Sequence, residues 1–256
     1  MRIMKQIKWF LWGVLGIWLP SLLFAREVMI STVDRPPYIS SALNDFGPFA
    51  EITRAAFLET GHTVRIEFFP WMRALEEVKL GRVDMMLAAY DTAARRRQFI
   101  YSNQIYEATN FVIGLKENGV KGYDQLSDLS EFTFGVTRGY AYSKEFMAAT
   151  ALNRQEALSP LTNLRKLFSK RIHFVVMDYA TFKEDLKKIP KKEQKPHILL
   201  TPPLSVNGFF NLFSRNIEDA PQLVDDFNRG LEVIKKNGQY NAIIKRFNVS
   251  PAHSGE

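Results

Sequence analysis

Alternating strand and helix patterns in the N-terminal third of the chain constrain its fold most. Apolar and polar residues alternate at 27–33, and further strands are predicted at 63–69 and 83–90. Between them, apolar residues at helical spacing predict helices at 47–61 and 70–81. This strand–helix–strand–helix–strand order predicts parallel strands with crossover helices, which is an α/β unit.

A second unit of the same kind follows in the middle of the chain. The sequence predicts strands at 132–139 and 172–178, and helices at 142–150, 163–170 and 179–188. Each unit has its own strands and helices, so we expect two α/β units.

Extended segments connect the two units. A strand at 110–116 leaves the first unit, and extended segments at 197–203 and 208–215 precede two closing helices within 220–247. Two crossings between two units favour a hinge that closes over a ligand in the cleft between them.

The first 25 residues have the pattern of a secretory signal peptide. A basic segment without acidic residues precedes an apolar run at 9–24, and Ala25 supplies a small residue at the cleavage point. A retained membrane anchor is the alternative, but the run is shorter than the ~20 residues of a spanning helix and Pro20 interrupts it. We expect export to the periplasm with cleavage near Ala25.

Composition narrows the function of the exported chain. Loss of three leader lysines and arginines lowers the net charge from +7 to +4, and much of the remaining basic excess lies in 187–195. No nucleic-acid motif accompanies this charge, so we expect no nucleic-acid partner. The chain has no cysteine, which excludes disulfides, thiolate catalysis and cysteine-ligated zinc.

Six motifs occur in an order that resembles the periplasmic solute-binding proteins of the polar amino-acid family, which feed ABC importers. They are DRPPY (34–38), PWMRALEEVKLGRVD (70–84), TAARRRQFIYSNQIY (92–106), FGVTRGYAY (134–142), VVMDYATF (175–182) and NGQYNAIIKRF (237–247). The resemblance covers essentially the whole mature chain, and its order is more specific than any single motif.

The resemblance implies a two-lobed periplasmic-binding-protein fold of type II, each lobe a mixed sheet flanked by helices. Lobe 1 would comprise residues 26–112 and 208–256, and lobe 2 residues 113–207. The hinge would lie near 110–116 and 201–210. The expected protein is a monomer that binds a small molecule and serves an ABC permease or a membrane sensor.

Arg95 is the residue that the resemblance assigns to a ligand carboxylate. A guanidinium presents a planar fork that matches a carboxylate, and a helix N-terminus adds backbone N–H groups and a favourable dipole. Successive helical side chains point about 100° apart. Arg96 and Arg97 are therefore expected to be surface or salt-bridge residues.

Asp178 matches the carboxylate that holds the ligand's amino group in the family. The alternative is an ordinary N-cap for the helix at 179–188, and the two roles are compatible. A buried carboxylate requires a cationic partner, which would be either a group on the ligand or a nearby arginine.

Aromatic residues at predicted strand ends and helix starts are expected to line the cleft. These are Tyr38, Trp71, Tyr90 and Tyr140. Each alone is compatible with ordinary packing, but together they predict an aromatic-lined site at the strand ends of the α/β units.

Two departures from the family pattern concern the ligand. Binders of simple α-amino acids follow the second-lobe strand with Gly-Ser/Thr-Thr, whereas this chain has Arg-Gly-Tyr-Ala at 138–141, and Arg35 stands where the family has a stacking aromatic. We therefore expect Arg35 to contact a ligand unlike a plain amino acid. A dicarboxylate, an aromatic acid, a small peptide and an acidic sugar derivative all remain open.

Other functions fit the sequence less well. A few members of this fold dehydrate small carboxylic acids, which requires a positioned acid or base. The four histidines have no metal-binding spacing, and nothing distinguishes Glu51 or Asp178 as a base. We expect no enzyme, metal or cofactor. The sequence predicts capture of a small anionic or zwitterionic solute for uptake, with ligand sensing for a membrane receptor as the alternative.

Overall fold

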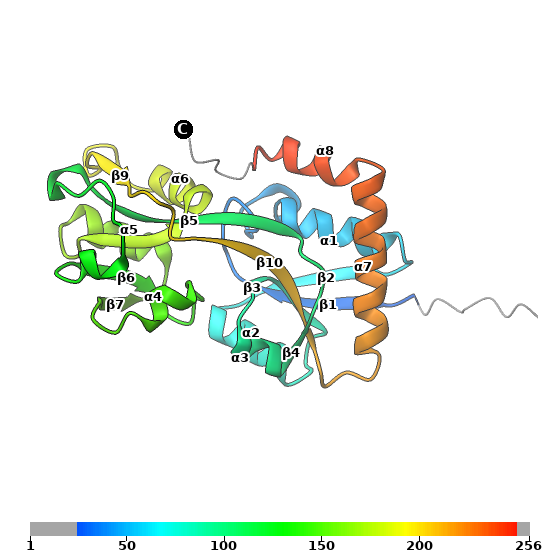
Figure 1. Cartoon of the computed structure of the whole chain (residues 1–256). Helices are drawn as coiled ribbons and strands as arrows, with labels where there is room; N and C mark the ends of the chain where they lie inside the picture. The colour runs from blue at the N-terminus through cyan, green and yellow to red at the C-terminus, as the bar shows by residue number, and fades with distance from the viewer. Residues whose placement is uncertain (1–24, 250–256) are drawn as a thin grey trace, which may run out of the picture.

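A computed structural model of the chain describes residues 25–249, in which ten strands form one mixed sheet (Figure 1). The sheet order is β2-β1-β3-β10-β5-β8-β6-β7, with β4 paired to β10 and β9 paired to β5. The strands are β1 (Glu27–Thr32), β2 (Thr63–Phe68), β3 (Met85–Tyr90), β4 (Phe99–Tyr101), β5 (Tyr106–Leu115), β6 (Thr133–Thr137), β7 (Asn153–Ala157), β8 (Phe174–Asp178), β9 (His197–Leu199) and β10 (Ser205–Ser214).

Helices cover both faces of this sheet (Figure 1). They are α1 (Pro48–Leu58), α2 (Trp71–Lys79), α3 (Ala93–Gln98), α4 (Lys144–Ala148), α5 (Pro160–Phe168), α6 (Tyr179–Lys187), α7 (Ala220–Lys236) and α8 (Gln239–Arg246). None of the helices within 25–249 is long and apolar enough to span a membrane. The predicted signal peptide lies outside the described residues except for Ala25.

The N-terminal α/β unit has the predicted parallel strands. Ile30 of β1 pairs with Ile66 of β2 on one side and with Met85 of β3 on the other. Alternate β3 residues face opposite ways, with Leu87 in the core cluster that contains α1 and α7, and Met86 in the cluster that contains α2. A fully buried strand between two helical layers explains why β3 is apolar throughout.

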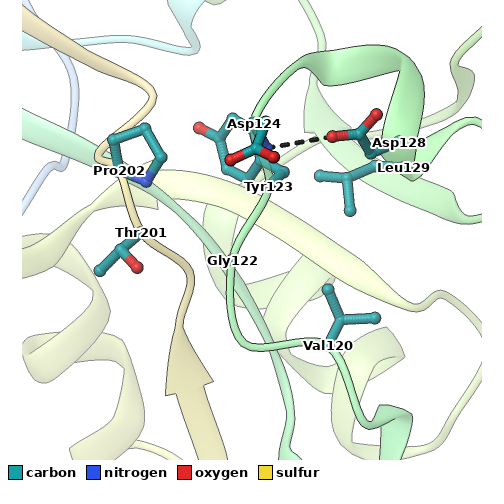
Figure 2. Close-up of a pocket in the computed structure, with 8 residues that line it drawn as sticks. All are labelled: Val120, Gly122, Tyr123, Asp124, Asp128, Leu129, Thr201 and Pro202. Carbon is teal, nitrogen blue, oxygen red and sulfur yellow. Dashed lines mark hydrogen bonds between the residues drawn. The ribbon is translucent and has the colours of Figure 1, made fainter.

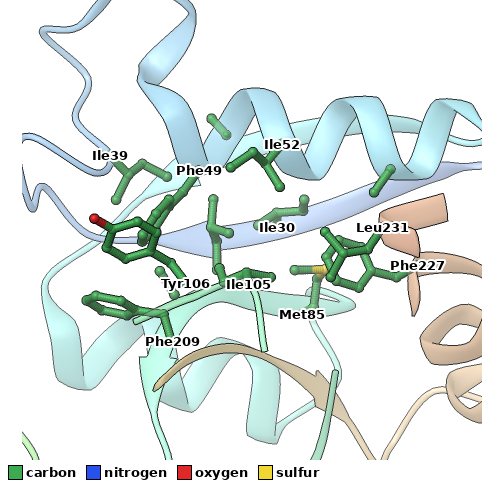
Figure 3. Close-up of a cluster of buried hydrophobic side chains, with 14 of the residues drawn as sticks. Ile30, Ile39, Phe49, Ile52, Met85, Ile105, Tyr106, Phe209, Phe227 and Leu231 are labelled. Carbon is green, nitrogen blue, oxygen red and sulfur yellow. The ribbon is translucent and has the colours of Figure 1, made fainter. Parts of the chain in front are cut away.

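Figure 3 shows the largest core cluster, where α1 and α7 pack onto the sheet. Phe49 of α1, Phe209 of β10 and Leu231 of α7 are almost completely buried in it. Burying one such side chain contributes about 1.5–3 kcal/mol. The helices are also very close, because a Cβ atom on Gly230 of α7 would overlap the carbonyl oxygen of Ala56 in α1.

The second unit repeats this arrangement. β6 pairs in parallel with β7 and β8, α5 and α6 pack on one face, and Phe146 of α4 packs on the other. Two short strands were not predicted from the sequence. β7 has the polar sequence NRQEA and lies at the sheet edge, and β4 has only three residues. Neither gives a periodic apolar signal.

Strands β5 and β10 connect the two units. The two strands are antiparallel neighbours (Figure 1), paired from Asn110↔Ser205 to Tyr106↔Phe209. Strand β5 continues into pairing with β8, where Asn110 lies opposite Asp178. The boundary between the hydrophobic cores of the two units also lies here. Ala108 belongs to the core cluster of the first unit, and Phe111 belongs to a core cluster of the second unit. The predicted crossings therefore correspond to two long strands of one continuous sheet.

Candidate functional site

A buried ion pair joins the two units. Arg35 follows β1, Asp178 ends β8, and Arg35 Nη2 donates a hydrogen bond to Asp178 Oδ2 at 3.0 Å. Arg35 is only 6% exposed and Asp178 only 1% exposed. A charge at this depth is stable only with a partner.

Asp178 receives two further hydrogen bonds at its other oxygen. Its Oδ1 accepts from the Tyr38 hydroxyl and from the Thr181 backbone N–H, both at 2.9 Å. The predicted N-cap of α6 is therefore confirmed. The sequence left open whether the cation beside Asp178 would come from the ligand or from an arginine, and in this structure Arg35 supplies it.

Aromatic rings surround the Arg35 guanidinium. Nη2 also donates to the Tyr90 hydroxyl at 2.8 Å, and the guanidinium carbon lies 4.7, 5.3 and 4.6 Å from the ring centres of Tyr90, Tyr140 and Phe209. Burial acts to lower the pKa of Arg35, but its interactions with Tyr90 and Asp178 outweigh burial and raise it. Burial raises the pKa values of Tyr38, Tyr90 and Tyr140, so these phenols remain protonated at neutral pH.

Two buried donor groups around this pair have no hydrogen-bond partner among the described residues. They are Arg35 Nε and Thr181 Oγ1. Both residues line a small cavity between the units, together with Tyr90, Asn110, Tyr140 and Asp178. Its volume is about 10 Å³, roughly enough for one water.

Arg95 makes a second link between the units. Thr92 caps α3 by accepting from the Arg95 backbone N–H, which places Arg95 in the first turn as predicted. Its guanidinium donates to the carbonyl oxygens of Tyr90 at 2.8 Å and of Gly139 at 3.1 Å, and lies 4.8 Å from the Trp71 ring centre. Burial lowers the pKa of Arg95 to about 10, so it stays charged at neutral pH. In this arrangement Arg95 lies beside the small cavity but does not line it.

The other arginines singled out in the sequence face solvent. Arg96 pairs with Asp91, and Arg97 is exposed, as expected for surface and salt-bridge residues. Arg138 pairs with Glu156 in an exposed position. Of the three consecutive arginines, only Arg95 is buried at the junction of the units.

Two larger hollows flank the small cavity. A groove of about 400 Å³ lies beside Trp71, and a second hollow of about 490 Å³ lies beside Arg35. Tyr140 and Pro160 line both hollows and the small cavity. The Trp71 and Tyr140 ring centres are 5.3 Å apart, and both residues line the groove of about 400 Å³.

A further hollow of about 530 Å³ lies elsewhere in the second unit (Figure 2). Tyr123, Asp124 and Asp128 line one side, with Thr201 and Pro202 opposite. Asp128 already accepts from the backbone N–H of Asp124. None of the predicted ligand residues lines this hollow, which is therefore not the candidate site.

Residues 34–250 match the family described as bacterial extracellular solute-binding proteins, family 3. The chain belongs to this family. The sequence matches no curated protein.

Solved structures share the fold of this family 3 protein. A histidine kinase sensor domain with similarity to periplasmic binding proteins aligns with a TM-score of 0.74 and 19% identity, over 88% of this chain and 98% of that one. An ancestral arginine-binding protein bound to arginine aligns with a TM-score of 0.72 and 20% identity, over 86% of this chain and 97% of that one. The substrate-binding protein of an amino acid ABC transporter aligns with a TM-score of 0.69 and 19% identity, over 86% of this chain and 98% of that one. The two-lobed α/β fold predicted from the sequence is thus confirmed.

The structure of this family 3 protein also brings unpredicted residues to the site. The Phe209 ring contacts the Arg35 guanidinium. Four other residues line the small cavity, namely Asn110, Thr137, Pro160 and Thr181. Thr181 had a weak signal, because it follows the capping Asp178 by three positions. Asn110 and Phe209 lie in predicted strands, where a sequence does not distinguish a site residue from a packed one.

Other polar residues considered in the sequence lie away from this site. Glu51 pairs with Arg246, and His62 pairs with Asp226. No group of three or more histidine, aspartate or glutamate side chains within 25–249 is arranged to hold a metal ion. His253 lies outside the described residues.

Proposed function

We propose that this chain is a periplasmic binding protein that captures a small anionic or zwitterionic solute between its lobes for ABC-type uptake. The observation that carries the proposal is the buried Arg35–Asp178 pair, which joins the two units beside a hollow that Arg35 and Tyr140 line. Such a junction can close over a ligand and part to release it.

The proposed lobes are residues 26–112 with 208–256, and residues 113–207. The change of core cluster between Ala108 and Phe111 supports the first crossing. In this proposal, the hinge lies near 110–116 and 201–210. Rotation there separates Arg35 from Asp178 and opens the cleft.

Arg95 is the proposed carboxylate clamp. Its two carbonyl contacts come from different lobes, so separation of the lobes frees the donor that now reaches Gly139. A ligand carboxylate can then accept a bidentate bond, which is stronger than a bond to a neutral carbonyl. Tyr38, Trp71, Tyr90 and Tyr140 are the proposed aromatic walls, with Arg35 and Asp178 between them.

We further propose a monomer without enzymatic activity or nucleic-acid partner, exported with cleavage near Ala25. The family is one of extracellular solute-binding proteins, which supports the export. The second candidate function is ligand sensing for a membrane receptor. The fold similarity to a histidine kinase sensor domain favours it, and the same site would serve both roles.

A ligand screen tests the proposal. Trp71 is the only tryptophan after residue 25, and it contacts both Arg95 and Tyr140. Its fluorescence and the melting temperature of the processed protein would be followed with amino acids, dicarboxylates, short peptides and acidic sugars. A ligand at 100 times its Kd adds about 2.7 kcal/mol of stability. Absence of any response across the library would contradict the proposal.

A further inference from the structure

We propose that the indole N–H of Trp71 is a second donor to the ligand carboxylate, beside the guanidinium of Arg95. This inference rests on the proposed function and extends its carboxylate site. It makes a free carboxylate, rather than a carboxamide, the group that the site requires.

Arg95 is a buried cation without a carboxylate partner within residues 25–249. It is 9% exposed, and its guanidinium donates to two backbone carbonyl oxygens, those of Tyr90 and Gly139. Asp91, which lies four positions earlier in the sequence, pairs instead with Arg96 on the surface. Because a buried charge without a counter-ion is unfavourable, this position favours an anionic group from the ligand.

Trp71 supplies an unused donor beside this cation. The guanidinium carbon of Arg95 lies 4.8 Å from the Trp71 ring centre. Trp71 Nε1 is buried, and no hydrogen-bond partner for it occurs among the described residues. An indole nitrogen can only donate, and buried donors normally have an acceptor. The unpaired N–H therefore identifies a place for an oxygen atom next to Arg95.

Both donors lie against the backbone of Gly139. Arg95 Nη2 donates to the carbonyl oxygen of this glycine at 3.1 Å. Trp71 Nε1 lies 3.3 Å from the position that a Cβ atom on Gly139 would take. The guanidinium and the indole N–H thus converge on one small region of the junction between the units.

The two donors belong to one lobe and Gly139 to the other. Trp71 begins α2 and Arg95 lies in α3, whereas Gly139 follows β6. When the proposed lobes separate, Trp71 and Arg95 stay together and lose the backbone that now covers them. One carboxylate can then accept from Arg95 with one oxygen and from Trp71 with the other.

The groove beside Trp71 provides space for the rest of the ligand. It has a volume of about 400 Å³, and its lining includes Phe69 and the ring of Trp71. Asp34 also lines it, and the hydrogen bonds that Asp34 accepts from Ser40 and Ser41 all go to Oδ1. Asp34 Oδ2 can accept a ligand ammonium, so amino acids and simple carboxylates both fit this site.

Nuclear magnetic resonance tests the donor role directly. Trp71 is the only tryptophan after residue 25, so the processed protein gives a single indole N–H signal in a proton–nitrogen spectrum. We expect a bound carboxylate to move the proton of this signal downfield, because a charge-assisted hydrogen bond forms at Nε1. The matching carboxamide should move it less. This measurement needs no substitution, so it holds even if a Trp71 variant does not fold.

Matched pairs of a carboxylate and its amide serve as probes. They are leucine with leucinamide, succinate with succinamide, 3-phenylpropionate with 3-phenylpropionamide, alanylalanine with its C-terminal amide, and glucuronate with glucuronamide. Titration calorimetry on the processed protein measures both members of each pair. In a pair that binds, we expect the carboxylate to bind at least about ten-fold more tightly, since hydrogen bonds to charged groups are stronger than those to neutral ones.

A Trp71→Phe substitution removes the N–H and keeps an aromatic ring. We expect about ten-fold weaker binding of the carboxylate and a smaller change for the carboxamide, so the ratio of their affinities falls. Arg73→Ala is the matched control. Arg73 is an exposed residue of the same helix that pairs with Glu77, and its loss should change neither affinity.

Four results would overturn the inference. Unchanged carboxylate affinity in a folded Trp71→Phe protein would refute it and leave the proposed function intact. Equal losses for carboxylate and carboxamide would show that Trp71 acts through its ring rather than its N–H. An indole signal that stays in place while a carboxylate binds would exclude the hydrogen bond. Failure of wild type to bind any member of any pair would contradict the proposed function as well.

Discussion

Arg35 and Asp178 are 143 positions apart in the sequence, yet their charged groups meet at 3.0 Å in the interior of the protein. One residue follows the first strand of the N-terminal unit and the other ends a strand of the second unit. Because both are buried, the pair holds the two units together only while each has its partner.

Asp178→Ala should destabilise the protein by about 3–5 kcal/mol, since it leaves the buried Arg35 without a counter-ion. It also removes the acceptor for the Thr181 N–H at the start of α6. Urea unfolding measures the loss. Glu156→Ala breaks the exposed pair with Arg138 and should change stability by less than about 1 kcal/mol. Equal effects of the two substitutions would contradict a special role for the buried pair.

Arg95→Ala should weaken ligand binding by about 2–5 kcal/mol, because it removes a charge-assisted donor and leaves the ligand carboxylate without its partner. Calorimetry with the first ligand identified measures this loss. Arg96→Ala removes the adjacent arginine, which pairs with Asp91 on the surface, and should have little effect. An Arg95→Ala protein that binds as tightly as wild type would rule out the clamp.

Stability should fall between pH 10 and about 12 because of Tyr142. Burial raises the pKa of this phenol to about 12, above its ordinary value of 10.0. In this window the unfolded chain releases the proton while the folded protein retains it, so unfolding becomes more favourable as pH rises. The loss is about 1 kcal/mol near pH 11. Urea unfolding across this window should show a shallower decline for Tyr142→Phe, and an identical pH slope would refute the assignment.

Gly230→Ala should destabilise the first unit although alanine is the better helix former. A Cβ atom there overlaps the carbonyl oxygen of Ala56, so α7 must move away from α1. Such overpacking costs about 1–3 kcal/mol. Asp225→Ala changes an exposed position of the same helix and serves as the control in thermal unfolding. A stabilised Gly230→Ala protein would show that the helices have room to adjust.

Local sequence was sufficient for most of the helices and strands and for several site positions, but not for the short strands β4 and β7. The apolar run at Phe174–Asp178 predicted a buried strand, and its terminal aspartate predicted the cap of α6. The family resemblance implied that Arg95 stands at the N-terminal end of a short helix, and Arg95 lies in the first turn of α3. These predictions succeeded because strand burial and helix capping depend on residues within a few positions of one another.

Tertiary structure alone decided which groups meet. The sequence identified Arg35 and Asp178 separately, but only the crossing of β5 and β10 between the units makes them partners. It also decided that Arg95 bonds to Gly139 across the junction and that Asn110 lies at the cavity. The physical reason is that the local sequence around a side chain determines its secondary-structure element and its burial. Its electrostatic partner depends instead on how the two units pack against each other.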